Sequence, residues 1–162
     1  MKINDVDLND IKVTIFDFDE TLAIHKDKDF TKHRSESEES FTNWYYNAYK
    51  NPNKFYDEIE PWTKSKILYN FINNLRNKKI KMYCLSGMKF SFHLKAKQTF
   101  IDKYYGNDIE VISTSEQELK LKGIRVIAKV NNCKLNEILF IDDNLDFIAL
   151  LQKNGIKAIH VD

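Results

Sequence analysis

The 162-residue sequence has few cysteines, almost no net charge and no long hydrophobic run. Its two cysteines, Cys84 and Cys133, do not suggest a disulfide framework, and Cys84 lies in an apolar run, so we expect a reducing compartment, the cytoplasm. The net charge of +1 gives no overall reason to expect nucleic acid or an anionic membrane as the main partner. No apolar stretch approaches the length of a membrane span, and the polar N-terminal residues predict no signal peptide.

What the sequence contains is typical of a folded globular protein, with 43% hydrophobic and 30% charged residues. The length suits one compact domain and is short for two, so we expect residues 1–162 to form a single domain. One irregular region, at about 23–60, interrupts the regular pattern and is interpreted as a small insertion. No feature of the sequence indicates an obligate protein partner.

Short apolar segments alternate with amphipathic segments over most of the chain. The pattern predicts strands at 12–18, 80–87, 109–113, 137–143 and 157–161, and helices at 63–78, 91–105, 115–131 and 147–155. Alternation of this kind predicts an α/β fold with three α/β/α layers and a mostly parallel central sheet. The first strand is apolar on both faces, which suits the middle of such a sheet.

The polar stretch 23–40 has no apolar period and is interpreted as a loop or as part of the insertion, which is expected to be mainly helical. Apolar side chains at i, i+3, i+4 and i+7 from Phe41 predict a short amphipathic helix with Ser40 as its N-cap, ending before Pro52. The aromatic side of that helix must be buried against another part of the protein. We expect it to pack on the sheet domain.

Polar residues with short side chains follow three of the predicted strands. They are Asp17 and Asp19, Ser86 and Gly87, and Asp142 and Asp143. Ligands of an open parallel sheet bind outside the carboxyl ends of its strands, so we expect these residues to face one crevice. Because side chains alternate along a strand, Asp17 and Asp19 are predicted to point the same way. Carboxylates gathered in one crevice repel each other unless a cation lies among them, and oxygen ligands favour Mg²⁺.

Three short segments carry a resemblance to a known family. The segment DFDET resembles the DxDx[TV] motif of the haloacid dehalogenase (HAD) superfamily, CLSG resembles its second motif, and FIDDN resembles its acidic fourth motif. The segments occur in the family's order, each at the end of a predicted strand, and the match spans the chain except about 23–60. With an insertion of this size, the resemblance implies a HAD phosphatase of the small-cap or nearly capless type.

The resemblance implies a Mg²⁺-dependent phosphohydrolase that cleaves a phosphomonoester through an aspartyl-phosphate intermediate. Asp17 would be the nucleophile, and Asp19 would protonate the leaving oxygen and then activate water. The Asp17 carboxylate, the backbone carbonyl of Asp19 and the Asp143 carboxylate would hold Mg²⁺, with Asp142 either a further ligand or a support for the ligands. The acid at Asp19 also separates phosphoryl transfer from dehalogenation, which needs no acid at that position.

The same resemblance implies a set of residues that hold the phosphoryl group. Thr21 of the first motif, the Ser86 hydroxyl and the backbone N–H groups around Gly87 stand at these positions. The family also has a lysine before the fourth strand, for which Lys120 and Lys122 are both candidates. A helical wheel puts Lys120 on the core-facing side of the predicted helix and Lys122 nearly opposite, which favours Lys120.

Two alternative functions are considered beside a phosphatase. A phospho-accepting, receiver-like signalling domain also uses an acidic pair, but there the pair ends the first strand and the acceptor aspartate comes later, whereas here DFDET comes first. A catalytically silent HAD-fold binding module is the other alternative, although no motif is missing. The order and completeness of the motifs favour the enzyme.

The motifs do not specify the phosphorylated substrate. A small phosphometabolite, a nucleotide, and a phosphorylated end of a nucleic acid or protein all suit an insertion of about forty residues. The aromatic and lysine residues of the insertion favour an extended or nucleotide-like partner.

Outside the motifs, the histidines show no metal-ligand spacing. They are His25, His33, His93 and His160. We expect all four to be surface or packing residues. Asp146, one helical turn beyond Asp143, is expected to be a favourable charge at a helix N-terminus.

Overall fold

The computed structural model describes residues 3, 6–25, 29–50, 59–88, 90–115 and 119–161, except the side chains of 29–31, 34 and 47–49. Five strands form its central sheet: β1 (Val13–Phe16), β4 (Lys81–Gly87), β5 (Ile109–Thr114), β6 (Ile138–Asp142) and β7 (Lys157–His160). They pair in parallel in the order β5-β4-β1-β6-β7. The buried, apolar β1 therefore lies in the middle, as its sequence predicts.

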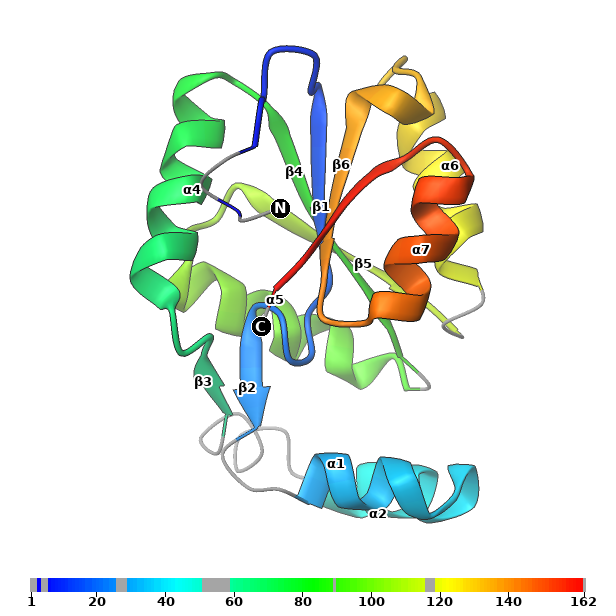
Figure 1. The fold of residues 1–162 in the computed structure, drawn as a ribbon. Helices are drawn as coiled ribbons and strands as arrows, with labels where there is room; N and C mark the ends of the chain where they lie inside the picture. Colours follow the sequence, from blue (N-terminus) through cyan, green and yellow to red (C-terminus); the bar gives the residue numbers. More distant parts are fainter. Residues whose placement is uncertain are drawn as a thin grey trace.

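Helices cover both faces of this sheet: α4 (Ser65–Asn77), α5 (Phe92–Tyr104), α6 (Lys120–Val130) and α7 (Leu145–Lys153). Helices α4 and α5 pack on one face, and α6 and α7 pack on the other (Figure 1). The predicted three-layer α/β fold with a parallel sheet is thus confirmed. None of the helices in the described ranges has both the length and the apolar character that a bilayer crossing requires.

The pairing register brings the carboxyl ends of three strands to the same edge. Phe16, the last residue of β1, is level with Cys84 of β4 and Ile141 of β6. Ser86 lies two residues beyond Cys84, and Asp142 directly follows Ile141. The polar residues that follow these strands in sequence are therefore neighbours in space, as expected for an open parallel sheet.

The insertion after β1 consists of a short hairpin and two helices. Strands β2 (Ala23–His25) and β3 (Ile59–Pro61) pair antiparallel, and α1 (Asp29–Glu36) and α2 (Glu38–Tyr49) lie beyond them, at the carboxyl-end edge of the sheet (Figure 1). Of the two interpretations of 23–40, the loop is wrong and the insertion holds, because this range contains β2, α1 and the start of α2. Helix α1 is almost entirely polar, so no apolar period reveals it.

Two predicted helix starts differ from the structure by three residues or more. The N-cap of α2 is Ser37 and not Ser40: the Ser37 hydroxyl accepts the Ser40 N–H at 3.0 Å, and α2 therefore begins three residues earlier. The helix expected over 115–131 begins only at Lys120.

Candidate active site

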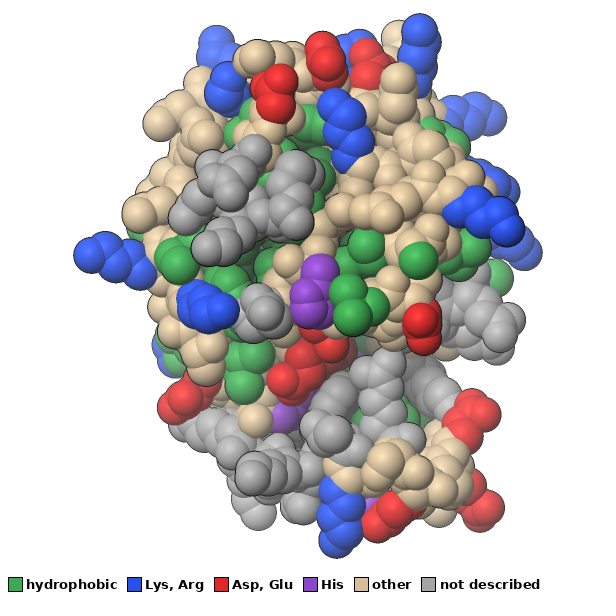
Figure 2. All heavy atoms as spheres, in the orientation of Figure 1, with side chains coloured by type: hydrophobic (Ala, Val, Ile, Leu, Met, Phe, Trp, Pro, Cys, Tyr) green, Lys and Arg blue, Asp and Glu red, His purple; other side chains and the backbone are tan. Residues whose placement is uncertain are grey.

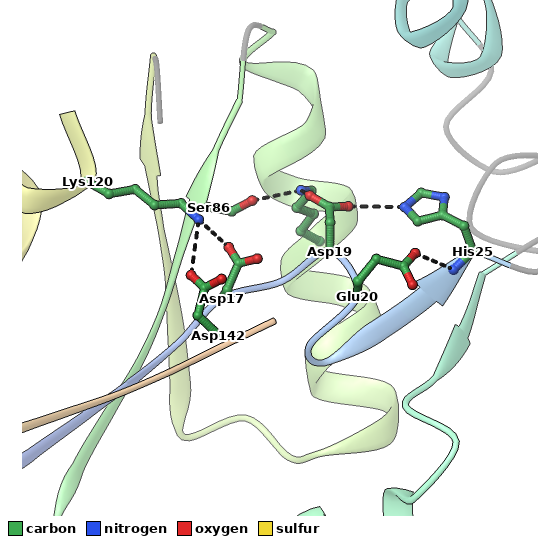
Figure 3. A network of polar contacts seen from close by, with 8 residues as sticks. Asp17, Asp19, Glu20, His25, Ser86, Lys120 and Asp142 are labelled. Atoms are coloured by element: carbon green, nitrogen blue, oxygen red, sulfur yellow. Dashed lines mark hydrogen bonds and ion pairs between the residues drawn. The ribbon is translucent and has the colours of Figure 1, made fainter. Parts of the chain in front are cut away.

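Asp17 directly follows β1 and is only 6% exposed. Its N–H donates to the carbonyl of Ile141 at 2.8 Å, which continues the ladder between β1 and β6. Its carboxylate lies 2.5 Å from the ammonium of Lys120, the first residue of α6, and that ammonium is also 3.7 Å from the carboxylate of Asp142 (Figure 3). A buried lysine thus lies between two buried carboxylates at the carboxyl end of the central strands.

Charge and burial oppose each other in this cluster. Burial alone would lower the pKa of Lys120, but the carboxylates of Asp17 and Asp142 outweigh it, and the pKa of Lys120 is raised. Burial, together with repulsion from Asp17, raises the pKa of Asp142 to about 7. The cluster therefore has more negative charge than one lysine can offset.

The geometry fits a hard divalent cation. Carboxylate oxygens of Asp17, Asp142 and Asp143 lie within 4.8 Å of one another. One oxygen of Asp142 accepts the N–H of Asn144 at 2.8 Å, while its other oxygen is buried and makes no hydrogen bond within the described residues. An all-oxygen donor set that carries excess negative charge is what Mg²⁺ prefers. The Asp19 carboxylate is not in this group, so a role for Asp19 as a ligand would have to come from its backbone carbonyl.

The Asp19 carboxylate is held by two basic side chains from different elements. Lys97 of α5 donates to one oxygen at 2.7 Å and to the hydroxyl of Ser86 at 2.8 Å. His25 of β2 has its Nε2 atom 3.2 Å from the other oxygen (Figure 3). Burial alone would raise the pKa of Asp19, but Lys97 and His25 outweigh it and hold that pKa well below its usual range.

A tight turn separates the two aspartates. Strand β1 ends at Phe16, and the carbonyl of Phe18 then accepts the N–H groups of Thr21, Leu22 and Ala23. Within this turn Glu20 has a φ of 60°, in the left-handed region that few residues other than glycine adopt. The predicted alternation therefore does not reach Asp19. Asp17 contacts a lysine from one side of the sheet, and Asp19 contacts a lysine from the other.

Lys97 and His25 are site residues that the sequence reasoning missed. Lys97 lies at i+4 from His93 and i−4 from Ile101, on the buried face of α5, so its unusual position could have been seen in the helical pattern. Its partner Asp19 is 78 positions away, and no spacing rule connects the two. His25 was expected at the surface or in packing, which is wrong, because the β2-β3 hairpin brings its ring to Asp19.

The residues expected to hold a phosphoryl group lie as follows. Ser86 is fully buried near the end of β4, and Gly87 is the last residue of that strand. Thr21 is buried in the turn after Asp19, and its hydroxyl makes no hydrogen bond in the described part of the chain. Of the two candidate lysines, Lys120 contacts Asp17, whereas Lys122 is exposed.

The insertion packs beside this site through its aromatic face. The ring of Tyr45 in α2 stacks on His93 of α5 with centroids 4.6 Å apart, and it lies 6.1 Å from the ring of Phe90. Burial and the negative charge of Asp19 raise the pKa of Tyr45, so the phenol lies within electrostatic reach of that carboxylate. Acidic side chains, with histidine beside them, gather where the insertion meets the sheet domain (Figure 2).

No family model and no curated protein matches this sequence. Solved structures do match its fold. A haloacid dehalogenase-like hydrolase from Bacteroides fragilis has a TM-score of 0.64 at 16% identity, over 93% of this chain and 87% of that one. The chain has the HAD fold.

Two further structures that match the fold contain ligands. A HAD family enzyme from Bacteroides thetaiotaomicron, crystallised in complex with magnesium and inorganic phosphate, matches with a TM-score of 0.58 at 15% identity, over 94% of each chain. The N-terminal part of a Bacteroides fragilis protein, which contains a phosphatase domain complexed with Mg, matches with a TM-score of 0.57 at 15% identity, over 94% of this chain and 36% of that one.

Proposed function

We propose that this protein is a Mg²⁺-dependent HAD phosphatase that hydrolyses a phosphomonoester through an aspartyl-phosphate on Asp17. The position of Asp17 carries the proposal. Its buried carboxylate lies at the carboxyl end of the central strand, beside the Lys120 ammonium and within 4.8 Å of carboxylate oxygens of Asp142 and Asp143. The HAD fold, and the magnesium and phosphate bound by a structural relative, support the same function.

The reaction has two steps. A carboxylate oxygen of Asp17 attacks phosphorus, the bond to the ester oxygen breaks, and Asp19 gives a proton to the leaving oxygen. Asp19 then takes a proton from water as the water oxygen attacks the phosphorus of the aspartyl-phosphate, which releases inorganic phosphate and restores the Asp17 carboxylate. Lys97 and His25 keep Asp19 ionised, as the second step requires. A phosphoryl dianion beside Asp19 raises its pKa and so prepares it for the first step.

Four residues hold the phosphoryl oxygens in this proposal. They are Thr21, Ser86, Gly87 and Lys120. Hydroxyl and backbone donors together with a buried ammonium stabilise negative charge far better in a closed site than in water. Mg²⁺ would be held by the carboxylates of Asp17 and Asp143 and the backbone carbonyl of Asp19, with Asp142 as a direct ligand or as a support for the ligands. Bound there, the ion would neutralise negative charge on the phosphoryl group.

The substrate classes named from the sequence define the test. Sugar phosphates, nucleotides, phosphorylated oligonucleotide ends and phosphopeptides are assayed with Mg²⁺ for release of inorganic phosphate. The wild-type protein is expected to hydrolyse at least one class. Asp17→Asn is expected to lose roughly 1,000-fold or more of the activity, because it removes the nucleophile.

Asp146→Asn is the matched control, because it removes an exposed carboxylate in the first turn of α7. It is expected to keep wild-type activity. Wild-type turnover by Asp17→Asn would refute the nucleophile, and full activity of the wild-type protein after exhaustive chelation would refute the metal requirement.

A further inference from the structure

The site contains a second buried ammonium besides that of Lys120, that of Lys97, which contacts Asp19 and Ser86. Among the described residues these two are the buried lysines, and they come from opposite faces of the sheet, Lys97 from α5 and Lys120 from α6. The proposed phosphoryl-binding role uses Lys120 alone. The contacts of Lys97 are different, and they indicate a different task.

Lys97 joins two groups that the proposed reaction needs close together. Its Nζ atom donates to the Asp19 carboxylate at 2.7 Å and to the Ser86 hydroxyl at 2.8 Å, and it lies 4.4 Å from the centre of the Phe18 ring. The side chain is fully buried. One ammonium thus fixes the proton-carrying carboxylate relative to a hydroxyl expected to hold the phosphoryl group.

Core packing alone does not explain a lysine at this position. Of the other buried positions of α5, Phe100 and Ile101 are apolar and His93 stacks on Tyr45, so an apolar side chain at 97 could extend the same packing surface. Burying an ammonium costs free energy, and replacing a buried ion pair by apolar groups is often neutral or stabilising. The presence of a lysine with charged and polar partners at this position therefore indicates a role in the reaction and not in the stability of α5.

We propose that Lys97 is a positioning residue that aims the Asp19 carboxyl group at the oxygen leaving the phosphorus atom held at Ser86. This inference rests on the proposed phosphatase function. Orientation matters here, because proton transfer requires the acid within hydrogen-bond reach of the leaving oxygen as the phosphorus–oxygen bond breaks. Without Lys97, Asp19 keeps its contact with His25 but loses the one that fixes it relative to Ser86.

The choice of leaving group isolates this role. An alkoxide is a poor leaving group and needs a proton during bond breaking, whereas p-nitrophenolate leaves without one. The kcat/KM value covers the steps up to release of the alcohol, so it reports on the first chemical step and not on hydrolysis of the aspartyl-phosphate. We therefore compare kcat/KM for p-nitrophenyl phosphate and for the best alkyl phosphomonoester of the panel.

Lys97→Met is expected to lower kcat/KM about 100-fold for the alkyl ester and less than about 3-fold for p-nitrophenyl phosphate. Lys95→Met, which changes an exposed lysine of the same helix, is the matched control and is expected to change neither value. Lys97→Gln keeps a hydrogen-bond donor without the charge. If Lys97→Met does not fold, Lys97→Gln replaces it in the test. Lys97→Gln is also expected to lower kcat/KM more for the alkyl ester than for p-nitrophenyl phosphate, but by a smaller factor.

Two results would overturn the inference, and they differ from a failure of the proposed function. Equal losses on both esters would mean that Lys97 acts only on folding or on phosphate binding. Unchanged kcat/KM for the alkyl ester would mean that Asp19 needs no help from Lys97. A wild-type protein that hydrolyses neither ester would instead refute the phosphatase proposal itself.

Discussion

The Lys120 ammonium is the counter-ion of two buried carboxylates, those of Asp17 and Asp142. Lys120→Met leaves both carboxylates buried without their cation, and breaking a buried pair in this way costs about 3 kcal/mol. We therefore predict that the free energy of unfolding, measured by urea titration in a metal-free buffer, falls by about that amount.

Lys122→Met is the control for this substitution, because Lys122 is exposed two residues further along α6. It should leave the free energy of unfolding unchanged within about 0.5 kcal/mol. If the two variants lose the same stability, Lys120 is not the partner of the buried acids.

A second ion pair predicts a pH dependence of stability. The guanidinium of Arg76 in α4 donates to both oxygens of Asp108 at 2.6 Å and holds the pKa of Asp108 below its usual range. The stabilisation by this pair is therefore fully present above the ordinary aspartate pKa of about 4 and is lost as the pH falls through the lower, folded-state value.

Asp108→Asn should thus cost less than about 1 kcal/mol near neutral pH, because the Asp108 side chain is 41% exposed and solvent screens the pair. In urea titrations at a series of pH values, the difference from wild type should shrink toward zero in acid. Asp10→Asn, at an exposed position, should show no such trend. A cost that grows as the pH falls would contradict the assignment.

The residues of the site differ in how far the sequence specifies them. Lys120 follows from helix geometry, since only that lysine shares the core-facing side of α6 with Ile124 and Ile127. The contacts of Lys97 and His25 with Asp19 could not be predicted, because they depend on where α5 and a hairpin of two three-residue strands come together in space. Local periodicity contains no information about that approach.

At the scale of elements, α6 must approach the sheet closely for Lys120 to reach Asp17. Gly123, one turn after Lys120, permits this approach: a Cβ atom there would lie 3.2 Å from the side chain of Leu85 and 3.3 Å from that of Thr114. A larger side chain at 123 would push α6 away from β4 and β5 and would carry Lys120 with it.

Gly123→Leu is accordingly predicted to lower the free energy of unfolding by about 1–3 kcal/mol, the usual cost of overpacking, and to reduce phosphatase activity. Urea titration and the phosphate-release assay measure the two effects. Val126→Leu, at a 61% exposed position of the same helix, should alter neither quantity. A fully stable and active Gly123→Leu would show that the spacing between α6 and the sheet is not critical.

Helices and strands could be predicted from the sequence where their apolar residues recur with a helical period or form a short continuous run. The amphipathic patterns of α4, α5 and α7 and the buried runs of β1 and β6 give these elements directly. The polar α1 has no such pattern, and β3 is three residues long and includes a proline. Both lie in the insertion, where contacts with the rest of the protein outweigh local preference.

At the scale of the whole molecule, the acidic cluster should link metal binding to stability. A ligand that binds only the folded state stabilises it by about 2.7 kcal/mol at 100 times its Kd. For a domain of this size we expect Mg²⁺ to raise Tm by about 5–10 °C. Differential scanning calorimetry measures Tm with Mg²⁺ and with NaCl at equal ionic strength. A larger rise with Mg²⁺ reports specific binding of the ion, because screening of surface charge is the same in both salts.

Asp143→Asn removes one carboxylate of the cluster and should abolish most of the Mg²⁺-dependent rise in Tm. Asp146→Asn should retain the full rise. Equal shifts with Mg²⁺ and NaCl in the wild-type protein would mean that the three carboxylates form no specific cation site.

The architecture of the whole molecule was predictable because strand and helix patterns alternate regularly and because the motifs stand at the ends of strands. A parallel sheet then places DFDET, CLSG and FIDDN at one edge, whatever the details of packing. The position of the insertion beside this edge depends on long-range aromatic contacts such as that of Tyr45 with His93, which no sequence period specifies.

The central claim is that Asp17 becomes phosphorylated during turnover. The protein is mixed with Mg²⁺ and its best substrate, quenched in acid within one turnover, reduced with borohydride and digested for peptide mass spectrometry. Borohydride reduces an aspartyl-phosphate to homoserine, and we predict this product at position 17 of the wild-type protein and not in Asp17→Asn. Continuing turnover with an unmodified peptide around Asp17, or reduction at another residue, would contradict the account.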